Sequence, residues 1–265
     1  MTTPYPGHLV VAGEQDAALV RTLQEALGQQ GYGPFTAGTF DAAMTSAVKL
    51  YQAQHADVQG HPLDIDGKVG RATWSALFGA APVTPASAPS TLMLLALGVA
   101  VTQVGQMEEP PSSNRGPMVD DYLRAAGIDP LHSSTDGRAW CMAFAYWVFK
   151  TAATALAAPN PLPRTAGCLD HWNRSAAIPG VQRITARAAC DDPRLVKPGL
   201  IFILDFGGGL GHAGLVERVA PGGRLTTLEG NSNTDGSRNG VGVFRVERRT
   251  LSDTSLKGFV DYSGA

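Results

Sequence analysis

Residues 139–150 read AWCMAFAYWVFK, and this segment constrains how the larger part of the chain can fold. Every residue in it except Lys150 is apolar or aromatic. A helix of that composition has no polar face, so it has to be enclosed by protein on all sides. The segments that precede and follow it must therefore supply a core around it.

Those neighbouring segments predict helices before this stretch and strands after it. Residues 92–103 and 118–126 have helical patterns, and Gly127 ends the second. Residues 200–206 (LIFILDF), 211–219 (GHAGLVERV) and 225–228 are predicted strands separated by Gly-rich and Pro-rich turns. Helices followed by strands predict an α+β domain with helices packed on an antiparallel sheet.

The first eighty residues predict a separate, small domain of three helices. Asp16 is a candidate N-cap, and apolar residues recur at three- and four-residue steps after it. Gly31 is a candidate helix end. A second helix and, after a turn at residues 64–67, a short third helix follow. The apolar positions of the three helices are Leu19, Val20, Leu23, Leu27; Met44, Ala47, Val48, Tyr51; and Trp74, Leu77, Phe78.

A segment with three prolines separates the two predicted domains. Residues 79–90 (GAAPVTPASAPS) carry no charge and no large side chain, which indicates an extended linker. The predicted organisation is therefore a helical domain at 1–79, a linker at 80–90 and an α+β domain at 91–265.

Composition excludes several functional classes. The 265 residues hold 21 Lys and Arg against 23 Asp and Glu, a net charge of −2, with 44% hydrophobic residues. This balance is typical of a globular protein and argues against disorder and against a nucleic-acid partner. The longest apolar run, residues 91–104, is too short to cross a bilayer. We expect a monomer without membrane insertion, made in the cytoplasm without a Sec-type signal.

Cys141 lies in the first turn of the apolar helix, where a thiol has two possible roles. Unsatisfied N–H groups and the helix dipole favour thiolate over thiol at this position, which suits a nucleophile. The alternative is a small buried hydrophobic residue, a common role for a cysteine.

Polar residues on the predicted strands favour the role of Cys141 as a nucleophile over that of a buried hydrophobic residue. His212 opens the second strand, and Glu229 and Asn231 follow the third, two residues apart and thus on one face. A cysteine hydrolase needs a thiolate, an imidazole, and a carboxylate or amide that orients the imidazole. Either Glu229 or Asn231 is a candidate for the last role.

The N-terminal segment resembles the peptidoglycan-binding domain that accompanies many cell-wall hydrolases. The resemblance covers about seventy residues, and its most specific part is the run Asp66-Gly67-x-Val69-Gly70-x-x-Thr73-Trp74. It implies that peptidoglycan is a partner of the protein. Candidate contacts for this ligand are Tyr32, Gln52 and Asp66.

The C-terminal segment resembles the CHAP family of papain-like amidases and peptidases. The resemblance rests on Trp140-Cys141-x-Ala143-Phe144, Gly211-His212-Ala213-Gly214 and Glu229-Gly230-Asn231. It implies hydrolysis of an amide bond in peptidoglycan. Cys141 would be the nucleophile, His212 the general base and then acid, and Glu229 or Asn231 the orienting group. Trp140 is a candidate substrate contact.

Several alternatives remain open at this stage. The protein is either a phage-type endolysin or an exported antibacterial toxin, in both cases acting on the wall after release or export. It is otherwise a wall-binding protein without activity, or a cysteine peptidase acting on proteins. No zinc motif occurs, the acidic pairs Asp120-Asp121 and Asp191-Asp192 are expected to be surface charge, and no cofactor is expected. Cys168 and Cys190, in loop-rich sequence, are expected to be unpaired thiols.

Overall fold

The structure is a computed structural model that describes residues 3–58, 60–79, 83–131, 139–233 and 240–265. The chain divides into two compact units. The N-terminal unit comprises Met1–Val83 together with Ala220–Arg224, and the C-terminal unit comprises Thr84–Val219 and Leu225–Ala265. Each unit has its own hydrophobic core. Residues 80–82 of the predicted linker lie outside the described residues.

The N-terminal unit contains three helices, as its apolar spacing predicts. Asp16 caps the first helix by accepting hydrogen bonds from the backbone N–H groups of Ala18 and Leu19, both at 3.0 Å, and Asp41 caps the second through the N–H of Met44 at 2.9 Å. The core encloses Leu23, Val48 and Trp74 among other apolar side chains. The helices are α1 (Ala17–Gln29), α2 (Ala42–Gln54) and α3 (Arg71–Phe78).

Part of the predicted linker is fixed to the C-terminal unit. The N–H of Ala86 donates to the carbonyl of Arg194 at 2.7 Å, and the ammonium of Lys197 donates to the Ser87 hydroxyl at 2.8 Å. Lys197 is buried and also pairs with Asp261 at 2.8 Å. These contacts correct the expectation of an extended, unanchored spacer for Ala86 and Ser87, because a backbone carbonyl holds the first and a side chain the second, both from far along the sequence.

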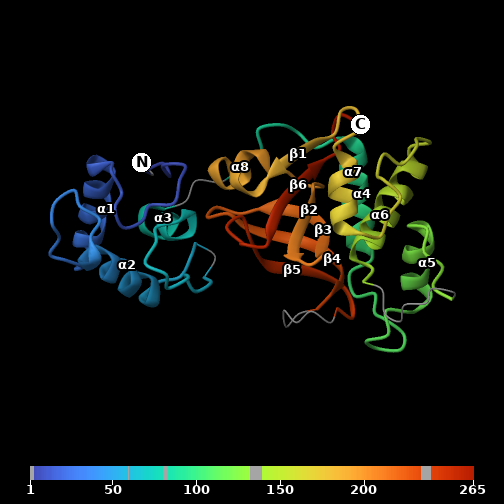
Figure 1. Ribbon diagram of the computed structural model, residues 1–265, viewed down its shortest axis with the longest axis horizontal. Helices are drawn as coiled ribbons and strands as arrows, with labels where there is room; N and C mark the ends of the chain where they lie inside the picture. Colours follow the sequence, from blue (N-terminus) through green and yellow to red (C-terminus); the bar gives the residue numbers. More distant parts are fainter. Residues whose placement is uncertain (1–2, 59, 80–82, 132–138, 234–239) are drawn as a thin grey trace. The chain divides into compact units, whose positions relative to one another are not determined.

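The C-terminal unit is an α+β domain, as predicted (Figure 1). Within the described residues its helices are α4 (Thr91–Thr102), α5 (Pro117–Ala125), α6 (Cys141–Ala155), α7 (Cys168–Ser175) and α8 (Ala186–Asp191), with a 3-10 turn at Pro193–Leu195. Its strands are β1 (Gln182–Thr185), β2 (Ile201–Gly207), β3 (Leu210–Val219), β4 (Arg224–Ser232), β5 (Gly242–Thr250) and β6 (Leu256–Asp261).

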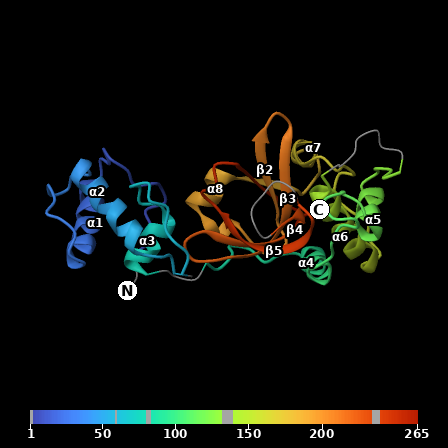
Figure 2. The same cartoon turned by 90° about the horizontal axis from the view of Figure 1, so that it is seen from below.

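The strands form one sheet with the order β1-β6-β2-β3-β4-β5 in the described part of the chain. The recorded strand pairs are antiparallel. Helix α6 packs against β3 and is flanked by α4 and α5, while α7 packs against β2 and β3. Figure 2 shows α7 beside the β2–β3 hairpin. The apolar helix is therefore enclosed as its composition requires, and Phe144 and Phe149 are fully buried on it.

The β2–β3 hairpin places the histidine. Gly207, Gly208 and Gly209 all have positive φ, between 60° and 83°, a conformation that side chains with a Cβ rarely adopt. The chain reverses there, and His212 comes to lie opposite Leu204 of β2. The glycine run is thus a hairpin turn, as its sequence predicts.

Several elements are absent from the sequence prediction. Cys168 and Cys190 lie on helices α7 and α8, whereas loops were expected for both. These helices are eight and six residues long, too short for a clear periodic pattern. No helix in the described ranges is both long and apolar enough to cross a membrane.

Candidate active site

Cys141 is the first residue of α6 and is buried, with 2% of the residue's surface exposed. The backbone N–H groups of a first helical turn have no partners within the helix. The residue before it, Trp140, provides no side-chain cap. The positive end of the α6 dipole is therefore available to a negatively charged sulfur.

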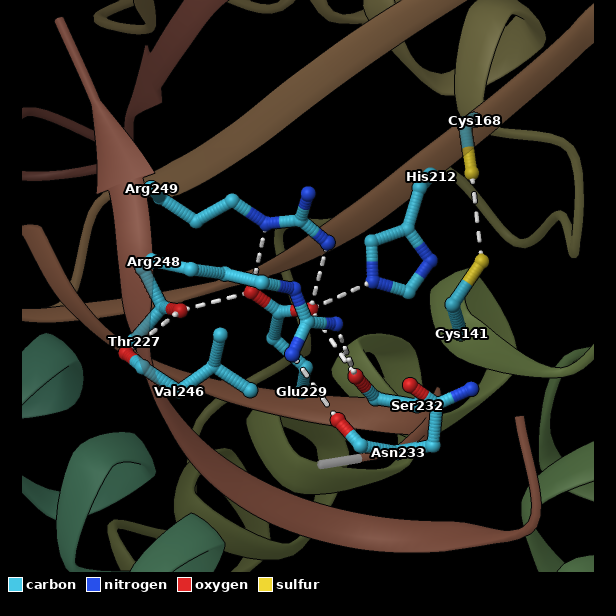
Figure 3. Close-up of polar contacts among 10 residues, drawn as sticks. All are labelled: Cys141, Cys168, His212, Thr227, Glu229, Ser232, Asn233, Val246, Arg248 and Arg249. Carbon is cyan, nitrogen blue, oxygen red and sulfur yellow. Dashed lines mark hydrogen bonds and ion pairs between the residues drawn. The ribbon is translucent and has the colours of Figure 1, made fainter. Parts of the chain in front are cut away.

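His212 lies between Cys141 and Glu229 (Figure 3). Its Nε2 is 2.8 Å from Oε2 of Glu229. The other ring nitrogen, Nδ1, is on the side of Cys141 in Figure 3, and a hydrogen bond with the Cys141 thiol contributes to the electrostatics of both groups. The three side chains come from α6, β3 and β4, so only the folded sheet brings them together.

Four side chains surround the buried carboxylate of Glu229. Arg249 of β5 donates from Nε to Oε1 at 3.0 Å and from Nη2 to Oε2 at 2.9 Å. The Thr227 hydroxyl donates to Oε1 at 2.6 Å, and the Ser232 hydroxyl donates to Oε2 at 3.1 Å. Burial alone would raise the pKa of Glu229, but the bonds and charges of His212 and Arg249 outweigh it and hold that pKa far below its usual value.

The thiol and the imidazole favour the ionic state of each other. A hydrogen bond from the Cys168 thiol lowers the pKa of Cys141 well below its usual range; burial opposes the shift, and the charge and hydrogen bond of His212 add to it. Burial opposes charging of His212, but Cys141 and Glu229 outweigh it and raise the pKa of His212 to about 9. The arrangement therefore favours a thiolate–imidazolium pair backed by a carboxylate.

Four of the residues that build this site are not among those predicted from the sequence. Thr227 precedes Glu229 by two positions on β4, so strand alternation was a signal that it shares the face of Glu229. Ser232, Arg249 and Cys168 offer no comparable local signal. Cys168 places its sulfur 3.5 Å from that of Cys141.

Two other predicted residues of this domain have different surroundings from those expected. Asn231 lies on β4 with a φ of 51°, and no hydrogen bond between it and His212 is recorded in the described part of the chain. Trp140 is fully buried, stacks on Tyr122 and donates its indole N–H to Glu108 at 2.8 Å. Its role as a substrate contact is thus corrected, because the enclosed indole presents no surface to a ligand.

The three candidate ligand contacts of the N-terminal unit do not form one group. Gln52 donates to Oδ1 of Asp66 at 3.1 Å and to the carbonyl of Lys68 at 2.9 Å, and accepts from the N–H of Gly67 at 2.9 Å. Gln52 is 2% exposed, so it shapes the turn rather than offering its amide to a ligand. Asp66 is exposed.

Tyr32 belongs to a different contact set. Its hydroxyl donates to Gln54 at 2.7 Å, and its ring packs edge-on against Tyr51. Half-buried Tyr32 and exposed Asp66 retain surface that a ligand can reach.

No group of three or more His, Cys, Asp and Glu side chains is arranged to hold a metal ion within the residues that the structure describes. The side chains around Cys141 instead form a set of hydrogen-bond donors and acceptors. That set suits nucleophilic and proton-transfer chemistry.

Comparison with known proteins adds two family matches to this geometry. The model of the CHAP domain matches residues 133–231, and the model of a peptidoglycan binding domain matches residues 16–77. No curated protein and no solved structure matches the chain. The first match includes Cys141, His212 and Glu229, and the second runs from the N-cap of α1 to the penultimate residue of α3. The chain therefore carries a segment that matches a peptidoglycan binding domain and, after it, one that matches a CHAP domain, and together the two matches support a cell-wall hydrolase role.

Proposed function

We propose that this protein cleaves an amide bond of peptidoglycan by cysteine-dependent hydrolysis. The observation that carries the proposal is the contact chain from Cys141 through His212 to Glu229, in which the thiolate, the imidazolium and the carboxylate are each the favoured state. The proposed bond joins muramic acid to L-alanine or lies within the stem or cross-bridge peptide.

In the first half-reaction the Cys141 thiolate attacks the carbonyl carbon of the scissile amide. The imidazolium of His212 transfers a proton to the nitrogen that leaves as an amine, and a thioester remains on Cys141. In the second half, neutral His212 takes a proton from water, whose oxygen attacks the thioester. The acid product leaves and the thiolate–imidazolium pair is restored.

The backbone N–H of Cys141 is a suitable donor to the oxyanion that forms at each attack. It lies in the first turn of α6, where N–H groups lack helical partners. A donor of this kind commonly contributes about 3 kcal/mol to the stability of the transition state. Glu229 keeps the imidazole oriented so that Nδ1 remains directed at the sulfur.

The peptidoglycan binding domain gives the hydrolase a second binding site for its insoluble substrate. Joining a binding module to a catalytic module raises the effective concentration of the catalytic site at the wall without any new contact in that site. We propose that the protein acts on the wall outside the cytoplasm, with a lytic role as an endolysin. Export as an antibacterial toxin would use the same chemistry.

The test compares the full-length protein with Cys141→Ala and Cys141→Ser on purified cell walls. Both variants are expected to lose lysis, measured as turbidity, while still sedimenting with the walls. Cys190→Ser is the matched control, because Cys190 lies on α8 and should leave lysis unchanged. Lysis by Cys141→Ala would overturn the nucleophile assignment.

Mass spectrometry of the fragments released from defined peptidoglycan identifies the bond. New amino termini at L-alanine indicate the muramoyl amide, and new termini within the peptide indicate endopeptidase action. Hydrolysis of a soluble protein in preference to the walls would contradict the proposed substrate class.

A further inference from the structure

A second thiol lies against the proposed nucleophile and has no part in the hydrolytic steps. Cys168 is the first residue of α7, and its sulfur is 3.5 Å from that of Cys141 at the start of α6. Figure 3 shows the two sulfur atoms facing each other from separate segments. Both cysteines are buried and neither is in a disulfide.

We propose that Cys141 and Cys168 are a site of reversible oxidation by peroxide, at which Cys168 closes a disulfide onto oxidised Cys141. The bond itself follows from the two thiols. Only its effect on lysis rests on the proposed function.

The geometry requires a small movement. Sulfur atoms in a disulfide are about 2.05 Å apart, so the two sulfurs must approach by about 1.5 Å from their present 3.5 Å. Rotation of two short side chains is of the right scale for this change.

The absence of a side chain at Gly211 leaves room for Cys168 beside the site. A Cβ at position 211 would lie 3.1 Å from Cβ of Cys168 and 2.7 Å from the carbonyl oxygen of Leu204. A larger residue would therefore press on the cysteine next to His212.

The two thiols differ in reactivity, which fixes the order of the steps. Cys141 favours the thiolate, as described above. Cys168 hydrogen-bonds to Cys141, is buried and faces that negative charge, and these effects raise the pKa of Cys168 well above its usual value. Cys141 therefore reacts with peroxide first, while Cys168 keeps its proton.

The chemistry balances with hydrogen peroxide as the only oxidant. The Cys141 thiolate attacks one peroxide oxygen, the O–O bond breaks, and a sulfenic acid and hydroxide form; the hydroxide takes a proton to become water. The sulfur of Cys168 then attacks the sulfenic sulfur. The S–S bond forms, and the departing hydroxide accepts the proton of Cys168 as a second water. Two thiols thus lose two electrons to one peroxide.

The disulfide removes the sulfur nucleophile, so hydrolysis stops. Exchange with a dithiol reductant restores both thiols. Without Cys168 the sulfenic acid lacks its partner thiol, and a second hydrogen peroxide oxidises it to the sulfinic acid with release of water. Dithiol reductants do not reverse that state.

The test treats the full chain with equimolar hydrogen peroxide and counts thiols before and after. The count is expected to fall from three to one. Trypsin should then release peptide 139–150 joined to peptide 165–174, two hydrogens lighter than the separate peptides. Lysis of cell walls should fall at least tenfold and return on addition of dithiothreitol.

Two variants sharpen the result. Cys190→Ser should form the same linked peptides, with a thiol count that falls from two to zero. Cys168→Ser should form no link. Treated with several equivalents of hydrogen peroxide beside the wild type, it should lose activity without recovery, because a second peroxide oxidises the Cys141 sulfenic acid to the sulfinic acid. If Cys168→Ser does not fold, Cys168→Ala takes its place.

Absence of the linked peptides from the wild-type digest would overturn the proposal, as would a link to Cys190. Recovery of Cys168→Ser by dithiothreitol to the wild-type extent would also overturn it. The peptide map does not depend on lysis. Linked peptides in a protein that never lyses walls would refute the proposed hydrolase and support the disulfide. Lysis without linked peptides would support the hydrolase and refute the disulfide.

Discussion

Arg249 and Glu229, twenty residues apart on neighbouring strands, form a two-bond ion pair behind the histidine. Both guanidinium bonds are 3.0 Å or shorter, and the carboxylate is fully buried. Burial opposes charge on Arg249, but its bonds to Glu229 raise the pKa of the guanidinium. We infer that Arg249 is a positioning residue, because it binds the carboxylate that contacts His212. It lies beyond residue 231, where the matched CHAP segment ends.

Replacement of Arg249 should lower catalysis through Glu229 rather than through substrate binding. Arg249→Lys keeps the charge but not the paired geometry, and we expect kcat to fall about tenfold, which corresponds to about 1.4 kcal/mol. Arg249→Met leaves a buried carboxylate without its cation and should lower the free energy of unfolding by roughly 3 kcal/mol. Urea unfolding and kcat measured separately from KM check both effects. A rise in KM alone would contradict the positioning role.

The pH dependence of hydrolysis should report the ion pair. The pKa of Cys141 is lowered, so the thiolate already forms at acidic pH. The pKa of His212 is raised to about 9, so the imidazolium is lost as pH rises through that value. Activity should therefore be high between the two values and fall above about pH 9. The measurement is kcat/KM against pH on a soluble peptidoglycan fragment, corrected for enzyme stability. A fall in activity centred near pH 6.5 would show that the pKa of His212 is not raised.

Variants of Glu229 and Asn231 should identify the group that orients His212. Glu229→Gln removes one of the causes that raise the pKa of His212, so the alkaline limb should move to lower pH. The lost charged hydrogen bond, roughly 2 kcal/mol, corresponds to about a thirtyfold loss of kcat. Asn231→Ala should change kcat less than about threefold, since no bond to His212 is recorded for it among the described residues. The reverse ranking would assign the orienting role to Asn231.

Two glycine-to-alanine changes form a matched pair. At Gly214 a Cβ would lie 2.7 Å from the carbonyl oxygen of Leu228 and from a ring carbon of Phe202, and 3.0 Å from Cγ of Glu229. Gly214→Ala should therefore lower both stability and kcat. At Gly98, on helix α4, a Cβ meets nothing within 4 Å among the described residues. Gly98→Ala should raise the free energy of unfolding by about 0.5–1 kcal/mol and leave kcat unchanged. Calorimetry measures the melting temperature of each variant, and lysis rates measure its activity. Equal effects of Gly214→Ala and Gly98→Ala would refute the packing argument.

Local pattern was sufficient for the parts of this protein that depend on nearby residues. The apolar composition of residues 139–150 determined a buried helix, and the spacing of Leu23, Val48 and Trp74 determined a small helical core. The position of Cys141 at a helix start and of His212 after a glycine turn is likewise local. Family models match both domains that these motifs indicated.

Contacts between distant segments required the folded chain. Trp140 adjoins Cys141 in sequence, yet its indole turns to Glu108 and is fully enclosed. Cys168 is 27 residues from Cys141, and only the packing of α7 against β2 and β3 brings it to the sulfur. Helical and strand periodicity places a residue on a face of its own element, but does not state which face of another element it meets.

Hydrophobic periodicity and turn residues act over short range, and they were sufficient to predict the two domains, the α+β class and the candidate thiol and imidazole. Three contacts depend on the folded chain: Glu229 with the histidine, Arg249 with this carboxylate, and the second thiol with the first. The physical reason is that side-chain charge states depend on burial and on partners within a few ångströms, and those partners come from strands and helices far apart in the chain.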